Sequence, residues 1–76
     1  MDEKELIRKW NELGYECTRF DDNYLFLKCK VRHEHIKFRN ESKEMMISSN
    51  VFSTFYIPIE AINLIHETVE WLGWNK

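Results

Sequence analysis

Glycine and proline are scarce in this sequence, which has only two glycines and one proline among its 76 residues. Loops that cradle phosphate groups need closely spaced glycines, because the backbone itself must approach the phosphate. The two glycines here stand at positions 14 and 73, far apart in the chain. A glycine-rich phosphate-binding loop is therefore excluded, and no linker, internal repeat or low-complexity segment is recognisable.

Cysteine is also scarce, and Cys17 and Cys29 do not have the spacing of a redox pair or a zinc site. Each stands where an apolar residue is expected, so we interpret both as reduced thiols of the core. Nucleophilic catalysis would need a cysteine beside a histidine and an orienting group. A chain this small also rarely encloses a substrate pocket. We therefore expect no catalytic residues and no enzymatic activity.

His33 and His35 could be read as two metal ligands, since residues two apart on a strand face the same way. A metal site needs a third and usually a fourth ligand. His66 lies on a predicted helix, and Glu34 points away from the two histidines. We therefore interpret the histidines as solvated turn residues and expect no metal or other cofactor.

Long hydrophobic runs are absent as well. The longest apolar stretch, around residues 55–65, is interrupted by a proline, a glutamate and an asparagine. A membrane-spanning helix needs about 20 apolar residues, and the charged N-terminus lacks the apolar segment of a signal peptide. We expect a cytoplasmic protein with no membrane partner.

The residues that are present are those of a globular protein, with 43% hydrophobic and 14% aromatic residues. Near the N-terminus, apolar residues at helical spacing predict a helix over residues 2–13, ended by Gly14. A second helix is predicted to begin with Pro58 at its first position and to end at Gly73. The predicted apolar faces are Leu6, Ile7, Trp10 and Leu13 in the first helix, and Ile59, Ile62, Ile65, Val69 and Leu72, widened by Ala61, Leu64 and Trp71, in the second.

Between the helices the apolar residues alternate with polar ones, which is the pattern of half-buried strands. We expect strands over residues 15–20, 24–32, 35–39 and 44–48, with turns at 21–23, 33–34 and 40–43, and a possible fifth strand over 51–57. The order predicts one α+β domain over residues 1–76, an antiparallel sheet of four or five strands with both helices on one face. The other face is then open to solvent or to a partner.

This open face is the candidate binding site. Aromatic side chains beside Lys and Arg can anchor an acidic protein partner, or stack bases and neutralise phosphates. They can also simply keep a solvated sheet soluble. The residues predicted to bind a partner are Tyr24, Phe26, Lys28, Lys30, Arg32, His35, Lys37 and Arg39.

The charge distribution bears on the choice between these partners. The net charge is −2, but residues 24–39 carry five Lys and Arg and a single acidic residue. The acidic remainder of the molecule would repel a long polyanion. Met45 and Met46 are adjacent, so one of them should be exposed on a strand and contribute apolar surface.

Both helix ends carry a resemblance to a known group of proteins. Leu13-Gly14-Tyr15 follows the first helix and Leu72-Gly73-Trp74 follows the second, which starts after Tyr56-Ile57-Pro58. In these features the chain resembles small accessory proteins encoded by phages and prophages of low-GC Gram-positive bacteria. The resemblance implies a viral protein in the host cytoplasm that binds and inhibits a host protein, such as a host-defence factor. It implies no catalytic residues.

The order of helix, strands and helix is also similar to double-stranded-RNA-binding domains. That family grips phosphates with lysines at the start of its second helix, whereas this chain has Pro58-Ile59-Glu60-Ala61 there. We therefore expect a small non-enzymatic protein that binds a host protein. The alternatives are a nucleic-acid-binding module that uses the same face, and a structural protein that pairs with a second copy through the open face or an edge strand.

Overall fold

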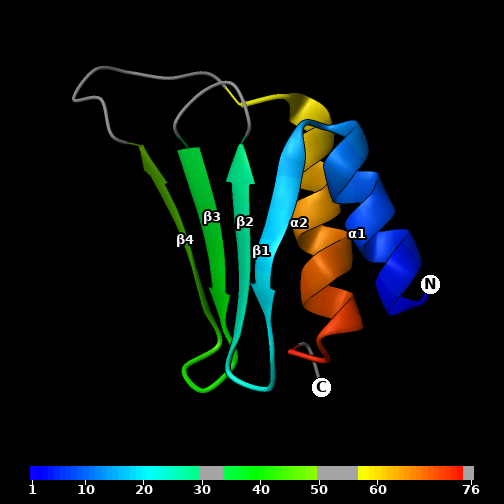
Figure 1. The fold of residues 1–76 in the computed structure, drawn as a ribbon. Helices are drawn as coiled ribbons and strands as arrows, with labels where there is room; N and C mark the ends of the chain where they lie inside the picture. The colour runs from blue at the N-terminus through cyan, green and yellow to red at the C-terminus, as the bar shows by residue number, and fades with distance from the viewer. Residues whose placement is uncertain (30–33, 50–56, 75–76) are drawn as a thin grey trace.

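The structure, a computed structural model, describes residues 1–29, 34–49 and 57–74. One antiparallel sheet in the order β1-β2-β3-β4 is followed by a C-terminal helix and preceded by an N-terminal one (Figure 1). This confirms the predicted α+β fold. Of the possible fifth strand, residues 51–56 lie outside the described residues, and Ile57 is not in a strand. The elements are α1 (Glu3–Glu12), β1 (Tyr15–Phe20), β2 (Tyr24–Cys29), β3 (Glu34–Arg39), β4 (Glu44–Ser49) and α2 (Ile59–Trp71).

Helix α1 begins and ends where the sequence predicts. The Asp2 carboxylate accepts a hydrogen bond from the Glu5 N–H at 2.9 Å, which satisfies a backbone donor that the helix itself leaves unpaired. At the other end Gly14 has a φ of 91°, a conformation that is costly for residues with a Cβ. Gly73 has a φ of 79° after α2, so the two helices end in the same way.

Helix α2 buries most of the predicted face, but not its N-terminal part. Ile59 is 73% exposed and Ile62 is 38% exposed, so the prediction that both belong to the buried stripe is wrong. Pro58 has an extended backbone and precedes the helix as its N-cap, not its first helical residue. The buried residues of α2 are Ala61, Leu64, Ile65 and Thr68. A buried threonine on this face explains the difference, because hydropathy alone does not place a polar residue in the core.

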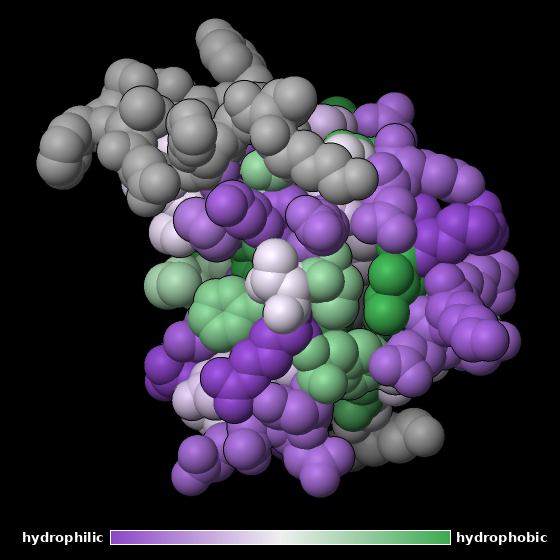
Figure 2. Space-filling view, viewed as in Figure 1, coloured by the Kyte–Doolittle hydropathy of each residue, from purple (hydrophilic) through white to green (hydrophobic). Residues whose placement is uncertain are grey.

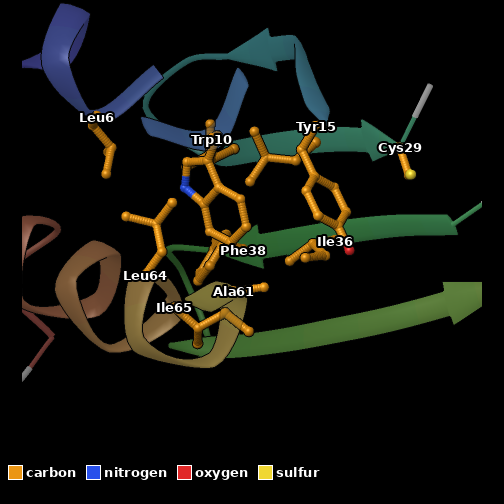
Figure 3. Packing of buried hydrophobic residues seen from close by; sticks show 11 residues of the cluster. Leu6, Trp10, Tyr15, Cys29, Ile36, Phe38, Ala61, Leu64 and Ile65 are labelled. Atoms are coloured by element: carbon orange, nitrogen blue, oxygen red, sulfur yellow. The ribbon is translucent and has the colours of Figure 1, made fainter. Parts of the chain in front are cut away.

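The core lies between the two helices and the inner face of the sheet (Figure 3). Trp10 is fully buried at its centre and contacts Tyr15 edge to face, with ring centroids 5.4 Å apart. Its indole N–H donates to the Thr68 hydroxyl at 3.1 Å, and that hydroxyl donates to the Leu64 carbonyl at 2.7 Å. These contacts join α1 to α2 and satisfy the polar atoms that the packing buries.

Glu34 differs from its prediction as a turn residue, because it is the first residue of β3 and is only 1% exposed. It lies on the inner face with Ile36 and Phe38, as the alternation of the strand requires. The Tyr15 hydroxyl donates to its carboxylate at 3.1 Å. Strand β3 therefore begins one residue earlier than predicted, with a buried carboxylate that has a hydrogen-bond donor beside it.

Candidate functional site

Six of the eight residues predicted to bind a partner are brought together on the open face of the sheet, away from the helices. They form three cross-strand pairs between β2 and β3: Tyr24 with Arg39, Phe26 with Lys37, and Lys28 with His35. Lys30 and Arg32, the other two, lie outside the described residues. The register of β1 and β4 adds Glu16, Arg19, Glu44, Met46 and Ser48 to this face.

Lys37 connects the two aromatic rings at the centre of the open face. Its ammonium nitrogen lies 4.9 Å from the centroid of the Tyr24 ring and 5.1 Å from that of Phe26. The two rings are 6.2 Å apart. Distances of this size allow cation–π attraction, which holds a long side chain in place on an otherwise exposed surface. The cation and the rings therefore form one cluster.

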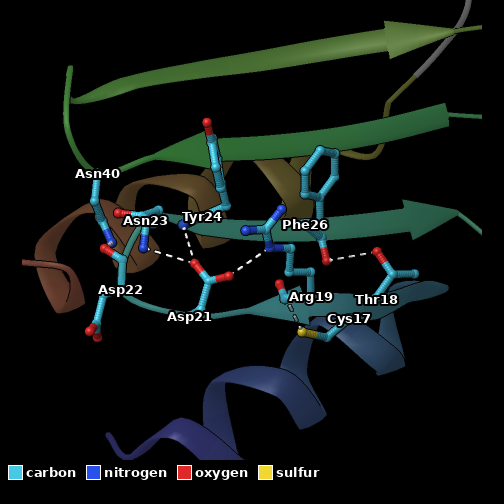
Figure 4. Close-up of polar contacts among 9 residues, drawn as sticks. All are labelled: Cys17, Thr18, Arg19, Asp21, Asp22, Asn23, Tyr24, Phe26 and Asn40. Carbon is cyan, nitrogen blue, oxygen red and sulfur yellow. Dashed lines mark hydrogen bonds and ion pairs between the residues drawn. The ribbon is translucent and has the colours of Figure 1, made fainter.

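Arg19 is a further member of this cluster that sequence reasoning missed. Its guanidinium carbon lies 4.8 Å from the centroid of the Tyr24 ring (Figure 4). Strict alternation from Tyr15 would turn Arg19 inward, but the register of β1 shifts between Cys17 and Arg19, which leaves Thr18 as an extra residue. The apolar spacing of 15, 17 and 20 in the sequence is the signal that could have revealed this shift.

The turn before β2 holds Arg19 and Tyr24 in position. One Asp21 carboxylate oxygen accepts from the backbone N–H groups of Asn23 and Tyr24, at 2.8 and 2.9 Å. The other accepts from the Arg19 guanidinium at 2.6 Å (Figure 4). The hydrogen bond from Arg19, followed by those from the backbone, lowers the pKa of Asp21. The Asp21 carboxylate therefore stays ionised at neutral pH and keeps its hydrogen bonds to Arg19 and to the backbone of Tyr24.

The remaining cations of the open face have no acidic partner among the described residues. The ion pairs involve Arg8, Lys9 and Arg19, and none involves Lys28, Lys37 or Arg39. Glu16 lies opposite Lys28 across the strands, and Glu44 lies opposite Arg39, without forming an ion pair with either. The face thus presents positive charge at its centre and a carboxylate on each flanking strand.

Apolar surface accompanies these charges. Met46 is 49% exposed, as expected for one of the two adjacent methionines, whereas Met45 packs against the core. Figure 2 shows hydrophobic residues exposed among hydrophilic ones on the side seen in Figure 1. Beside Met46 lies a shallow hollow of about 280 Å³. It is lined by Lys37, Arg39, Glu44, Met45 and Met46. It is small for a ligand site but suits one or two side chains of a partner.

The other candidate groups do not assemble into a site in the part of the chain that is described. Cys29 is buried, and burial raises the pKa of the Cys17 thiol, which makes it a poor nucleophile. Glu34 and His35 lie on opposite faces of the sheet. A second hollow of about 310 Å³ between the helices is lined mainly by polar residues, with Glu12, Glu60 and Glu67 among them.

Two further observations concern the described residues as a whole. None of their His, Cys, Asp and Glu side chains gather in a group that could hold a metal ion. Neither of their helices has the length and apolar character required to cross a membrane. Comparison of the whole chain with protein-family models, curated proteins and solved structures finds no match in any of the three.

Proposed function

We propose that this chain is a small non-enzymatic binding protein that attaches to a host protein through the open face and inhibits or modulates it. The observation that carries the proposal is a set of three cations around two aromatic rings, Lys28, Lys37 and Arg39, which have no acidic partner among the residues that the structure describes. Aromatic residues and arginine are the side chains that contribute most binding energy at protein interfaces. The phage-like helix ends at Gly14 and Gly73 favour a host protein as the target.

The partner should present carboxylates together with some apolar surface. Carboxylates would neutralise the three cations, and an apolar side chain would cover Met46 beside the hollow on β4. The charges would mainly raise the association rate and select the partner, because exposed pairs contribute little net affinity. The exposed parts of the Tyr24 and Phe26 rings would add apolar contact area beside the cations.

A nucleic acid fits this face less well. Base stacking needs free ring faces, but Lys37 and Arg19 already lie over the rings. The carboxylates of Glu16 and Glu44, on the strands that flank β2 and β3, would repel the evenly repeated phosphates of a nucleic acid that crosses the face. A protein partner can instead confine its carboxylates to the centre of the face. A groove for single strands normally lacks such acidic borders.

The test is a pull-down from bacterial lysate with the tagged chain, with and without nuclease. We expect a discrete protein band that survives nuclease, and we expect the double variant Lys28→Glu with Lys37→Glu to lose that band. Reversal of two central charges turns attraction into repulsion, so the captured amount should fall at least tenfold. Lys4→Glu with Lys43→Glu makes the same change of charge at two exposed positions outside the open face.

The control pair should capture the partner like the unmodified chain, and circular dichroism should show that both double variants are folded. Undiminished capture by the Lys28 and Lys37 variant would exclude the open face as the binding surface. If nuclease removes all of the captured material, the open face binds nucleic acid instead of a protein. The affinity should then fall steeply as the salt concentration rises.

A further inference from the structure

The two edges of the sheet differ in how well they are protected from other strands. Strand β1 is interrupted by the extra residue Thr18 and contacts α1. Strand β4 pairs with β3 without interruption over all six residues, and no described strand lies along its outer side. It contains no proline, lysine or arginine. Edges without a bulge, a proline or a cation are the ones that pair with further strands.

The hydrogen bonds of the sheet show which backbone groups this edge offers. The Asn40 N–H donates to the Asn23 carbonyl at 2.9 Å, which makes these two residues a hydrogen-bonded pair in the register of β2 and β3. Hydrogen-bonded and non-hydrogen-bonded pairs alternate along an antiparallel ladder. It follows that the N–H and C=O groups of Lys37 point toward β4.

The same alternation extends to β4. Met46 is the partner of Lys37, so its backbone groups point toward β3. The N–H and C=O groups of its neighbours Met45 and Ile47 then point to the outer edge. These groups need an acceptor and a donor from another chain or from water.

From this edge we infer that β4 binds β4 of a second copy in antiparallel orientation, about a two-fold axis perpendicular to the sheet. In the register that we propose, Met46 lies opposite Met46 of the second copy. Met45 then forms a hydrogen-bonded pair with Ile47 of the copy, and Glu44 lies opposite Ser48. The two sheets become one continuous sheet with all four helices on the same side.

In this register each side chain of β4 lies opposite a side chain of compatible polarity on the copy. On the inner side Met45 meets Ile47, two apolar side chains that are only partly buried by their own core. On the open side the two exposed Met46 side chains cover each other at the axis. Glu44 lies between Arg39 of its own chain and Ser48 of the copy, so no like charges oppose each other. A register shifted by two residues would pair Met46 with the polar Ser48. A register shifted by one residue would place the helices of the copy on the opposite side of the joined sheet.

The first test measures mass in solution by sedimentation over a range of concentrations. We expect the mass of one chain, 9.4 kDa, to double as the concentration rises. Met46→Lys places two ammonium groups opposite each other at the axis, so it should remain a single chain where the unmodified protein is fully dimeric. The control Ile62→Lys also replaces an exposed apolar side chain with lysine, but on α2, so this variant should dimerise normally.

A single-chain mass up to the solubility limit would overturn the inference, and so would a folded Met46→Lys variant that still doubles in mass. Circular dichroism establishes that the variant is folded.

The second test examines the register itself. Opposite residues of a non-hydrogen-bonded pair have Cα atoms about 4.5 Å apart, which is within the range that a disulfide bridges. Met46→Cys should therefore form a covalent dimer on mild oxidation. Ser48→Cys should not, because its copy would lie about four residues further along the strand. The unmodified chain measures the background from Cys17 and Cys29. Equal cross-linking of the two variants would contradict the proposed register.

Discussion

Trp10 shows how a single polar contact can orient a helix. Its ring fills the centre of the core, and its N–H is satisfied only because the Thr68 hydroxyl faces it. The hydroxyl in turn donates to the Leu64 carbonyl one turn earlier in α2. This requirement explains why Thr68 is buried while the apolar Ile62 faces outward.

The first prediction concerns this hydrogen bond. Thr68→Val keeps the shape of the side chain but removes the acceptor, so that the indole N–H is buried without a partner. We expect the free energy of unfolding to fall by about 1–3 kcal/mol, measured by urea denaturation followed by circular dichroism. Thr68→Ser keeps the hydroxyl and loses one methyl group, so it should cost about 1 kcal/mol. A Thr68→Val variant as stable as the unmodified protein would show that the bond does not stabilise the fold.

At the scale of the elements, the irregularity in β1 determines the composition of the binding surface. Thr18 has no partner in the register with β2, and from Arg19 onward the alternation is reversed. As a result, Arg19 lies beside Tyr24 on the open face. Phe20 turns inward, where its ring contacts that of Trp71 with centroids 5.5 Å apart.

A deletion tests this interpretation of β1. Removal of Thr18 makes the register continuous and leaves Cys17 and Phe20 inward and Arg19 outward, so the chain should still fold with a small loss of stability. Removal of Glu16 changes the phase before the bulge and forces Tyr15 or Cys17 to the wrong face. Because Tyr15 is fully buried, that deletion should cost about 3 kcal/mol or more. Thermal unfolding of both variants compares them, and equal destabilisation would contradict the role of Thr18.

The sequence allowed much of the open face to be predicted, for a physical reason. Strands β2 and β3 have one buried face, so their alternation specifies which side chains point outward, and Tyr24, Phe26 and Lys37 lie there as predicted. Arg19 was missed because a bulge changes the phase without changing the composition. The buried Glu34 was missed because its environment comes from Tyr15, which is distant in the chain.

For the whole molecule, the two proposed interfaces share Met46 but depend on different groups: the cations of β2 and β3 for the host protein, and the outer backbone edge of β4 for the second copy. The Lys28→Glu and Lys37→Glu variant changes the open face but none of the residues that we pair across β4. We expect it to lose the captured host protein and to keep the concentration-dependent doubling of mass, measured by sedimentation of the same preparation. Loss of both properties in a folded variant would show that the dimer also depends on Lys28 or Lys37.

The hydrogen bond between Trp10 and Thr68 joins residues that are 58 positions apart, and it has a consequence for the chain as it leaves the ribosome. Until Thr68 has been synthesised, the inner face of the finished strands has no second helix to cover it. Leu25, Leu27, Ile36 and Phe38, all buried in the complete fold, are exposed during that interval. The nascent chain therefore stays vulnerable to aggregation and proteolysis until α2 has emerged.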